Sequence, residues 1–471
     1  MTAATLAPPT EREYAAGLDL ARLSARGDLP QLVDQLRRTS GCANPIHLQG
    51  SRTLLHTPTG QVLHRYATDT EPGQRLRVAC GNRRASRCRS CARTYAADTF
   101  HLIRAGLVGD EAKGVPSAVR TRPRVFATLT APSFGPVHNR PDTRACRCGR
   151  RHRETDPLLG TPLDVGRYDY RHAVLWNNVA PELWRRFTIY LRRELARAVG
   201  LTRKEFEDHA RISFGKVAEY QRRGAVHFHV VMRLDGPDGA ATDPPSWATV
   251  DLLDRVIRSA AGRVFVPLEA VGDVPAMILR WGAQVDVRPI KAFGDGSAIT
   301  EQAVASYVAK YATKSAEATE SVDRRITERH DIGRFNLPAH TRRLIETCWD
   351  LDDLYPERKL AHWSHMLGFR GHFSSKSPSY STTLGALRKV RADFRAEQSR
   401  ADLRERLLAK GLPDLDDLPE AETLVLAHWV YAGSGLTPGE SLLAAGIAEQ
   451  LEHNRTTARE ESQRLTQEME E

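Results

Sequence analysis

The chain has 471 residues and a formal net charge of +10, with 68 Lys and Arg against 58 acidic residues. This length exceeds one ordinary core and predicts about three domains at roughly 150 residues each, and the basic excess favours a polyanionic partner. No apolar run approaches the roughly 20 residues of a membrane span, and the first residues lack the pattern of a signal peptide, so we expect a cytoplasmic protein without a membrane partner.

Composition divides the chain into three segments. Residues 1–118 contain a cluster of cysteines and arginines. Residues 119–318 alternate strand-like and helix-like patterns and include an insertion over 131–173. Residues 319–471 are largely helical and end in an acidic tail. We therefore expect an N-terminal metal-binding segment, a central α+β domain and a helical C-terminal domain.

The first segment combines seven arginines and no acid over residues 75–93, a run that is either a solvated face or a DNA contact. Three of the seven cysteines crowd into the same run: Cys80, Cys88 and Cys91. Disulfides are rare in the cytosol, and this spacing is close to that of zinc ribbons, so we expect a structural Zn²⁺. A tetrahedral site needs a fourth ligand, for which Cys42 is the first choice and His47 and His101 are alternatives.

The central segment follows the order β-α-β-β-α-β-α. This order predicts a mainly antiparallel sheet with helices packed on one face, a ferredoxin-like layer. A helix over 181–199 has Pro181 in its first turn. The strands are expected at 124–130, 211–220, 225–234 and 284–290, and the other helices at 249–262 and 301–315.

The strand at 225–234 carries two histidines on one face. Its period of two directs Val226 and Phe228 to one side and His227 and His229 to the other. Two imidazoles in this position can chelate one metal ion, although paired strand histidines without a metal are the alternative.

A carboxylate on the preceding strand can join them. A three-residue hairpin loop, Arg222 to Gly224, places Glu219 opposite His227, whereas a two-residue loop turns Glu219 to the other face. Such a mixed nitrogen and oxygen site suits Mg²⁺ or Mn²⁺, and Zn²⁺ is an alternative.

The helix at 301–315 carries two Tyr-x-x-Lys units on one face, Tyr307 with Lys310 and Tyr311 with Lys314. A tyrosine hydroxyl is a weak nucleophile, with a pKa of about 10, and a lysine one turn away supplies positive charge for the phenolate and for a phosphate under attack. The alternative is a solvated face with two incidental tyrosines. Val304, Ala305, Val308 and Ala312 are expected on the packed side.

Three motifs in this order resemble those of rolling-circle replication initiators of the HUH endonuclease superfamily. They are FATLT at 126–130, the HFH of residues 227–229, and the doubled tyrosine motif of residues 307–314. The paired tyrosines are similar to those of single-stranded-DNA phage initiators. The stretches CGNRRASRCRSCART, YDYRHAVLWNN, AEYQRRGAVHFHVV and GHFSSKSPSYSTTLGALRK resemble RepSA-like initiators of actinobacterial plasmids and integrative elements over most of the chain.

The resemblance implies a mechanism. A divalent ion on His227 and His229 polarises the scissile phosphate, and one tyrosine attacks to leave a 5′-phosphotyrosyl link. The freed 3′-OH primes a host polymerase, and the second tyrosine acts when the circle is complete. Some viral initiators have an acidic third ligand where Glu219 stands. The implied partners are origin DNA, with a single-stranded or cruciform nick site and a duplex binding site, and a host helicase, since the chain contains no ATP-binding phosphate loop.

A second cysteine group is present in the insertion. Cys146 and Cys148 are followed by His152. The relatives carry a further cysteine pair in a PLCxxCYDY-like segment, where this chain has Asp164 and Arg167, and this departure argues against a second zinc site.

Two other functions fit the same motifs. A rolling-circle transposase also combines N-terminal cysteines, paired histidines and two tyrosines, and would act on terminal-repeat DNA. A zinc-containing DNA-binding regulator would bind its operator without a covalent product and would tolerate loss of both tyrosines. A conjugative relaxase fits less well, because its tyrosine usually precedes its histidines.

Overall fold

The computed structural model of the chain describes residues 10–290, 301–313, 322 and 324–470. Its contacts divide the chain into two compact units, unit 1 (Met1–Tyr95 and Arg388–Glu471) and unit 2 (Ala96–Leu387). The sequence analysis predicts three consecutive domains, whereas here the two ends of the chain build one unit together. None of the helices in the described part of the chain combines the length and apolar character that a bilayer crossing requires.

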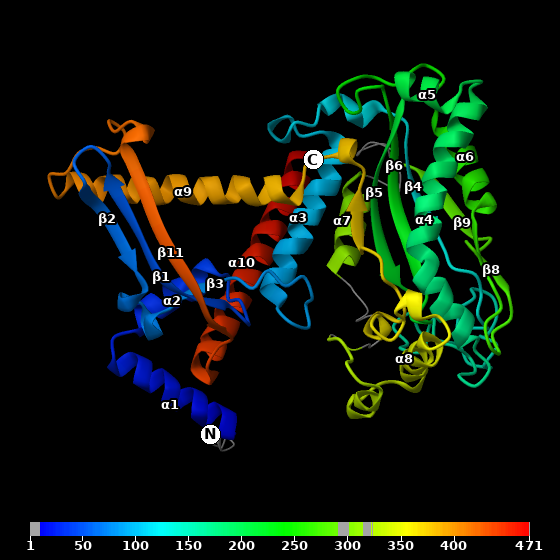
Figure 1. Cartoon of the computed structure of the whole chain (residues 1–471), viewed down its shortest axis with the longest axis horizontal. Helices are drawn as coiled ribbons and strands as arrows, with labels where there is room; N and C mark the ends of the chain where they lie inside the picture. The colour runs from blue at the N-terminus through cyan, green and yellow to red at the C-terminus, as the bar shows by residue number, and fades with distance from the viewer. Residues whose placement is uncertain (1–9, 291–300, 314–321, 323, 471) are drawn as a thin grey trace. The chain divides into compact units, whose positions relative to one another are not determined.

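Unit 2 is built on a five-stranded antiparallel sheet with the strand order β10-β5-β6-β4-β9 (Figure 1). The strands of unit 2 are β4 (Arg124–Leu129), β5 (Arg211–Tyr220), β6 (Val226–Asp235), β9 (Val285–Pro289) and β10 (Ser374–Lys376), with β7 (Phe265–Leu268) and β8 (Met277–Arg280) forming a separate pair. Its helices are α4 (Tyr170–Ala198), α5 (Arg203–His209), α6 (Val250–Arg263), α7 (Glu301–Thr313) and α8 (Ala339–Asp352). The antiparallel sheet is confirmed. The predicted elements occur in their predicted sequence, but α5, β7 and β8 are additional elements that the sequence analysis did not predict.

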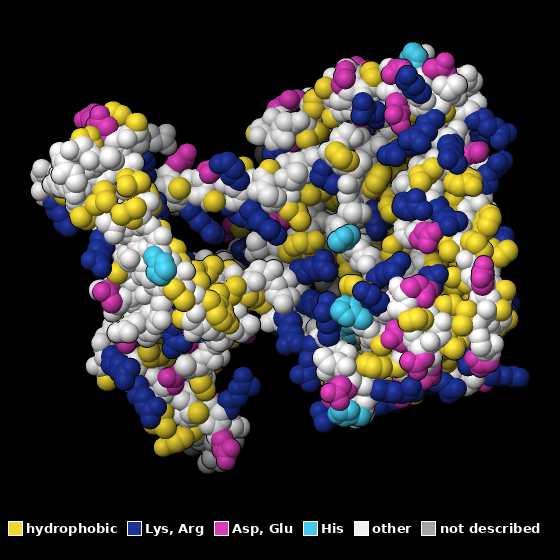
Figure 2. Space-filling model, in the orientation of Figure 1, with side chains coloured by type: hydrophobic (Ala, Val, Ile, Leu, Met, Phe, Trp, Pro, Cys, Tyr) yellow, Lys and Arg dark blue, Asp and Glu magenta, His cyan; other side chains and the backbone are white. Residues whose placement is uncertain are grey.

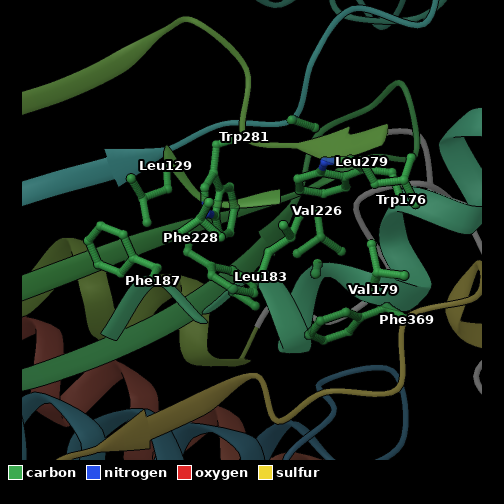
Figure 3. Close-up of a cluster of buried hydrophobic side chains, with 14 of the residues drawn as sticks. Leu129, Trp176, Val179, Leu183, Phe187, Val226, Phe228, Leu279, Trp281 and Phe369 are labelled. Carbon is green, nitrogen blue, oxygen red and sulfur yellow. The ribbon is translucent and has the colours of Figure 1, made fainter. Parts of the chain in front are cut away.

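One face of this sheet packs on α4 and α6 and forms the main core. Val226 and Phe228 of β6 lie on this face, as their alternation with the histidines predicts, and contact apolar side chains of α4 (Figure 3). Trp281, which directly follows β8, also belongs to this cluster. Its ring makes an edge-to-face contact with the ring of Trp176 of α4, with 5.6 Å between the two centroids. Burying these large side chains is the main stabilisation that holds the sheet in register.

The opposite face is also covered, so the prediction of helices on one face only is wrong. This surface, here called the histidine face, carries Glu219 and both histidines, and α7 packs on it beside β5. The second half of α3 (Arg89–Val108) lies on it too, because Arg124 of β4 donates to Leu107 O and Arg233 of β6 donates to Gly106 O. The arginines buried on this face have carbonyl and carboxylate groups as hydrogen-bond partners in place of water.

Helix α4 begins eleven residues before the predicted start. The side chain of Asp169 caps it by accepting from His172 N, and Pro181 stands inside the helix instead of in its first turn. The early turns bury an apolar stripe that includes Val174 and Trp176. This burial outweighs the hydrogen bond that Pro181 cannot donate. Between β4 and α4, residues 130–169 contain no helix or strand, in line with the predicted insertion.

Unit 1 contains a sheet in the order β11-β1-β2, with β3 also pairing with β1. Leu32 and Leu36 of α2 pack on Ala444 of α10 in its small core. The strand β11 shows that the C-terminal segment is not helical throughout. Its apolar stretch LVLAHWVY contains β-branched and aromatic residues, which favour a strand, and this strand pairs with β1. The elements of unit 1 are α1 (Glu11–Ala25), α2 (Leu29–Arg38), β1 (Ile46–His56), β2 (Gln61–Ala67), β3 (Leu76–Val78), β11 (Thr423–Ser434), α10 (Pro438–Glu470) and parts of α3 and α9 (Leu384–Leu408).

Candidate metal and tyrosine site

The turn between β5 and β6 sets the geometry of the site. Gln221 N donates to Ala225 O at 2.9 Å, and Gly224 adopts a φ of 77°, which closes a three-residue loop with glycine in the left-handed region. A Cβ at Gly224 would also collide with Leu344. With this loop the Cα partner of His227 is Glu219, the register on which the predicted third ligand depends.

Glu219, His227 and His229 converge on one point. Oε2 of Glu219 lies 2.9 Å from Nε2 of His227 and 3.0 Å from Nε2 of His229. Without an ion these are hydrogen-bond distances, and they also equal the separation of about 3.0 Å between neighbouring ligands in an octahedron of about 2.1 Å bonds. The three side chains are 4 to 16% exposed, so the cluster is largely shielded from solvent.

Surrounding groups fix the ionisation state and orientation of the cluster. Burial raises the pKa of Glu219, but hydrogen bonds from His227 and His229 lower it by more, so the carboxylate stays ionised. Burial lowers the pKa of His229 and favours its neutral ring. Thr128 Oγ1 lies 3.1 Å from Nδ1 of His229. With an ion in place of the hydrogen bond between His229 and Glu219, a proton on Nδ1 would make Nε2 the ligand atom.

Tyr307 reaches the cluster from α7. Its hydroxyl lies 3.2 Å from Nε2 of His229, and its ring stands edge-on to the ring of His229 at 4.9 Å between centroids. Phe126 of β4 stacks on His229 and meets Tyr307 edge-on, so the FATLT strand supports both rings. Tyr307 is 37% exposed, whereas Val304 and Val308 on the other side of α7 are buried, as their spacing predicts.

The rest of the predicted tyrosine motif falls beyond the structural description. Lys310 and Tyr311 belong to α7, but their side chains lie outside the described residues, as does that of Ala312, and Lys314 is outside them altogether. The geometry of the second tyrosine and of both lysines therefore stays a prediction.

A buried ion pair anchors the start of α7. Glu301 accepts from Arg124 of β4 at 2.6 Å and from Arg120 at 3.1 Å. The side chains of Arg124 and Glu301 are each 3% exposed, while Arg120 is 46% exposed. Because Arg124 projects from the same face of β4 as Thr128, this pair fixes α7 and its Tyr307 over the histidines.

Unit 1 contains a separate cluster of four sulfurs, Cys42, Cys80, Cys88 and Cys91. Sγ of Cys42 lies 3.8 Å from that of Cys88 and 3.7 Å from that of Cys91, and Cys80 lies 3.6 Å from Cys91. Zinc–sulfur bonds of about 2.3 Å at tetrahedral angles separate sulfurs by about 3.8 Å, so the cluster could hold zinc. Hydrogen bonds from the Cys42 and Cys91 thiols lower the pKa of Cys88, which favours its thiolate. His47 and His101 are not part of this cluster.

The sequence reasoning did not single out Thr128 or Glu301. Thr128 is inside the FATLT motif, so its alternation with Leu129 could have placed it on the histidine face. Glu301 carries no such signal, because its partners Arg120 and Arg124 are about 180 residues away in the chain.

Comparisons with known proteins show the family of this chain. The family model RepSA, described as the replication initiator protein of pSAM2, matches residues 28–449. A curated Replication initiator protein from Streptomyces ambofaciens is 60% identical over 444 residues, which cover 94% of this chain and 95% of that protein. No solved structure matches the chain significantly.

A family match over most of the chain defines the class: the protein is a replication initiator. More narrowly, the chain belongs to the RepSA family.

Proposed function

We propose that this protein starts rolling-circle replication of a plasmid or integrative element by nicking one strand of its origin DNA as an HUH-type enzyme. The observation that carries the proposal is the tyrosine hydroxyl of α7 held 3.2 Å from a histidine of a three-ligand cluster. Family membership supports the role in replication. The motifs alone fit a replication initiator and a rolling-circle transposase equally well. Family membership therefore favours the replication initiator.

The three ligand atoms fit a hard divalent cation. One carboxylate and two imidazoles suit Mg²⁺ or Mn²⁺, and the separations of 2.9 and 3.0 Å match an octahedral edge. When bound there, such an ion would supply charge that stabilises the phosphate under attack.

The chain's own groups then perform a transesterification. The hydroxyl oxygen of Tyr307 or Tyr311 bonds to phosphorus, the bond from phosphorus to the 3′ oxygen breaks, and the 3′ oxygen takes up a proton equivalent to the one the tyrosine loses. The link that forms is a 5′-phosphotyrosine. Because one phosphate ester replaces another, the reverse step can rejoin the strand, and a second tyrosine allows nicking and joining to be separate events.

Surface charge supports binding of DNA. Lys and Arg side chains are spread over the face of unit 2 that Figure 2 shows, among smaller groups of acidic side chains. Contacts of this kind position a duplex through its phosphates. Host helicase and DNA polymerase complete the proposed reaction, the polymerase extending the free 3′-OH.

The test uses the full chain, an origin duplex and a single-stranded oligonucleotide across the nick site, with Mg²⁺ or Mn²⁺. The unaltered protein should form a covalent adduct that withstands denaturing electrophoresis, and the double variant His227→Ala, His229→Ala should form none while binding the duplex with little change. Undiminished nicking by the double variant would contradict the proposed metal site. Binding without any adduct by the unaltered protein would favour the non-catalytic regulator.

A further inference from the structure

A second group of metal-binding side chains lies in the insertion between β4 and α4, outside the site described above. His138, Cys146, Cys148 and His152 bring their ligand atoms within 4.8 Å of one another. Nδ1 of His138 lies 3.3 Å from Nε2 of His152, which lies 3.2 Å from Sγ of Cys148. Sγ of Cys146 lies 3.9 Å from Nδ1 of His138. His138 is the ligand that the sequence reasoning missed.

These separations fit one tetrahedral ion. Zinc bonds of about 2.0–2.1 Å to nitrogen and about 2.3 Å to sulfur place two nitrogens about 3.3 Å apart and a nitrogen about 3.5 Å from a sulfur. The observed nitrogen pair agrees with the first value, and the two nitrogen–sulfur distances lie on either side of the second. Two thiols and two imidazoles form a donor set that zinc prefers.

A neighbouring carboxylate orients one of the ligands. Oδ2 of Asp156 lies 2.7 Å from Nδ1 of His152, whose side chain is completely buried. This contact fixes a proton on Nδ1 and directs Nε2 toward the cluster, the arrangement commonly found behind zinc-bound histidines. The other oxygen of Asp156 accepts from Leu158 N at 2.9 Å, so the carboxylate is itself held in place.

The backbone between the cysteines forms a turn that brings both thiols to one side. Gly149 N donates to Cys146 O at 2.8 Å with a φ of 83° at the glycine, and Cys146 N donates to Arg150 O at 3.0 Å. Residues 138–156 have few apolar side chains and six arginines. Cys146 and His152 are nonetheless buried. Hydrophobic burial cannot order such a segment, whereas a bound metal can.

We propose that His138, Cys146, Cys148 and His152 bind a second structural Zn²⁺, distinct from the four-cysteine cluster of unit 1. The ion would order the insertion against the β5–β6 turn. Arg222 of that turn donates to Asp156 O at 3.0 Å and to Pro157 O at 2.6 Å, directly after the ligands. The second zinc would therefore support the turn that sets the register of Glu219.

The test is the zinc content of the full chain, purified without chelator and measured by elemental analysis. We expect about two zinc ions per chain, about one in the variant Cys146→Ser, Cys148→Ser, and about one in the matched variant Cys80→Ser, Cys88→Ser. Cys348→Ser is the control, because this buried cysteine belongs to neither cluster, and should retain both ions.

Two further measurements separate metal loss from misfolding. His138→Cys supplies a thiolate in place of an imidazole and should retain two ions, whereas His138→Ala should lose one. Trypsin should cleave after Arg150 and Arg151 at least tenfold faster in the Cys146→Ser, Cys148→Ser protein, but not in the Cys80→Ser, Cys88→Ser protein. One zinc ion in the unaltered chain, or two in the Cys146→Ser, Cys148→Ser variant, would overturn the proposal. Neither result depends on nicking.

Discussion

Thr128 contacts His229 of the proposed metal site. The bond between Thr128 Oγ1 and Nδ1 of His229 orients the ring, so Thr128→Val should weaken the binding of the divalent ion about 10- to 100-fold. Nicking by the variant should recover at high Mn²⁺, since the ligands themselves are intact. The dependence of nicking rate on Mn²⁺ concentration measures this, and Thr128→Ser, which keeps the hydroxyl, should behave like the unaltered protein. An unchanged Mn²⁺ dependence in Thr128→Val would show that the contact does not position the ring.

Lys216 lies on the core face of β5, where its Nζ donates to His372 O and stands 4.1 Å from the centre of the Phe228 ring. Burial lowers the pKa of this lysine to about 7, against about 10.4 in an unfolded chain. Between these values the unfolded state binds a proton that the folded state does not. Stability therefore falls as the pH decreases from about 10.4 to about 7, and the loss is complete below that range.

Replacing the buried amine should remove this penalty. Lys216→Met should raise the free energy of unfolding by a few kcal/mol at pH 7.5, and most of the gain should disappear by pH 10. Urea unfolding at the two pH values measures the difference. A gain that is equal at both would mean that the lysine is not held neutral by the fold.

The position of α7 depends on the ion pair between Glu301 and Arg124. Glu301→Gln leaves a buried arginine without its counter-charge and should cost about 3–5 kcal/mol, which loosens α7 and slows nicking by Tyr307. Arg120→Gln is the matched variant, because it removes the half-exposed partner of the same carboxylate and should cost at most about 1 kcal/mol. Unfolding curves and initial nicking rates test both, and equal effects of the two variants would argue against a special role of Arg124.

The elements of unit 2 could be predicted because their signals are local. Strand alternation and the spacing on α7 lie within short stretches, so the placement of His227 and His229 on one strand face followed from the sequence. The position of Glu219 depended on the length of the β5–β6 turn, which only the structure gives as three residues. In the insertion, the sequence reasoning did not find His138 as the fourth member of the cluster with Cys146, Cys148 and His152. His138 lies eight residues before Cys146, which matches no standard zinc spacing. Helix α4 was predicted too short because a proline usually marks the first turn of a helix. The burial of the residues before Pro181 involves contacts with distant parts of the chain, which the local sequence does not show.

Unit 1 contains contacts between residues far apart in the chain, and these could not be predicted from the sequence. Strand β1 pairs with β11 over residues almost 400 positions apart, and nothing in either strand specifies the other. The buried ion pair of Arg77 and Glu440, which joins β3 to α10, could not be predicted for the same reason. The four cysteines, in contrast, all lie within residues 42–91. The spacing of Cys80, Cys88 and Cys91 predicted a cluster, and the structure places Cys42, the first choice for the fourth ligand, beside them.

Glu440 should therefore hold the two ends of the chain together. Glu440→Gln leaves Arg77 buried beside a neutral amide and should destabilise unit 1 by about 3–5 kcal/mol. Hydrogen exchange should accelerate in peptides from β1 and β11, while peptides from β4 and β6 act as an internal control and should be unaffected. Faster exchange throughout both units would contradict the division into two units, and no change in β1 would contradict the role of the pair.

The most direct measurement of the nicking mechanism is the identity of the residue that carries DNA in the trapped adduct. The full chain is reacted with an origin oligonucleotide and a divalent cation, digested, and the DNA-linked peptide is sequenced by mass spectrometry. We predict attachment to Tyr307 or Tyr311, some remaining adduct in at least one of Tyr307→Phe and Tyr311→Phe, and none in the double variant, because phenylalanine keeps the ring packing and removes only the nucleophilic oxygen. DNA on a serine, or on a tyrosine elsewhere in the chain, would contradict the mechanism.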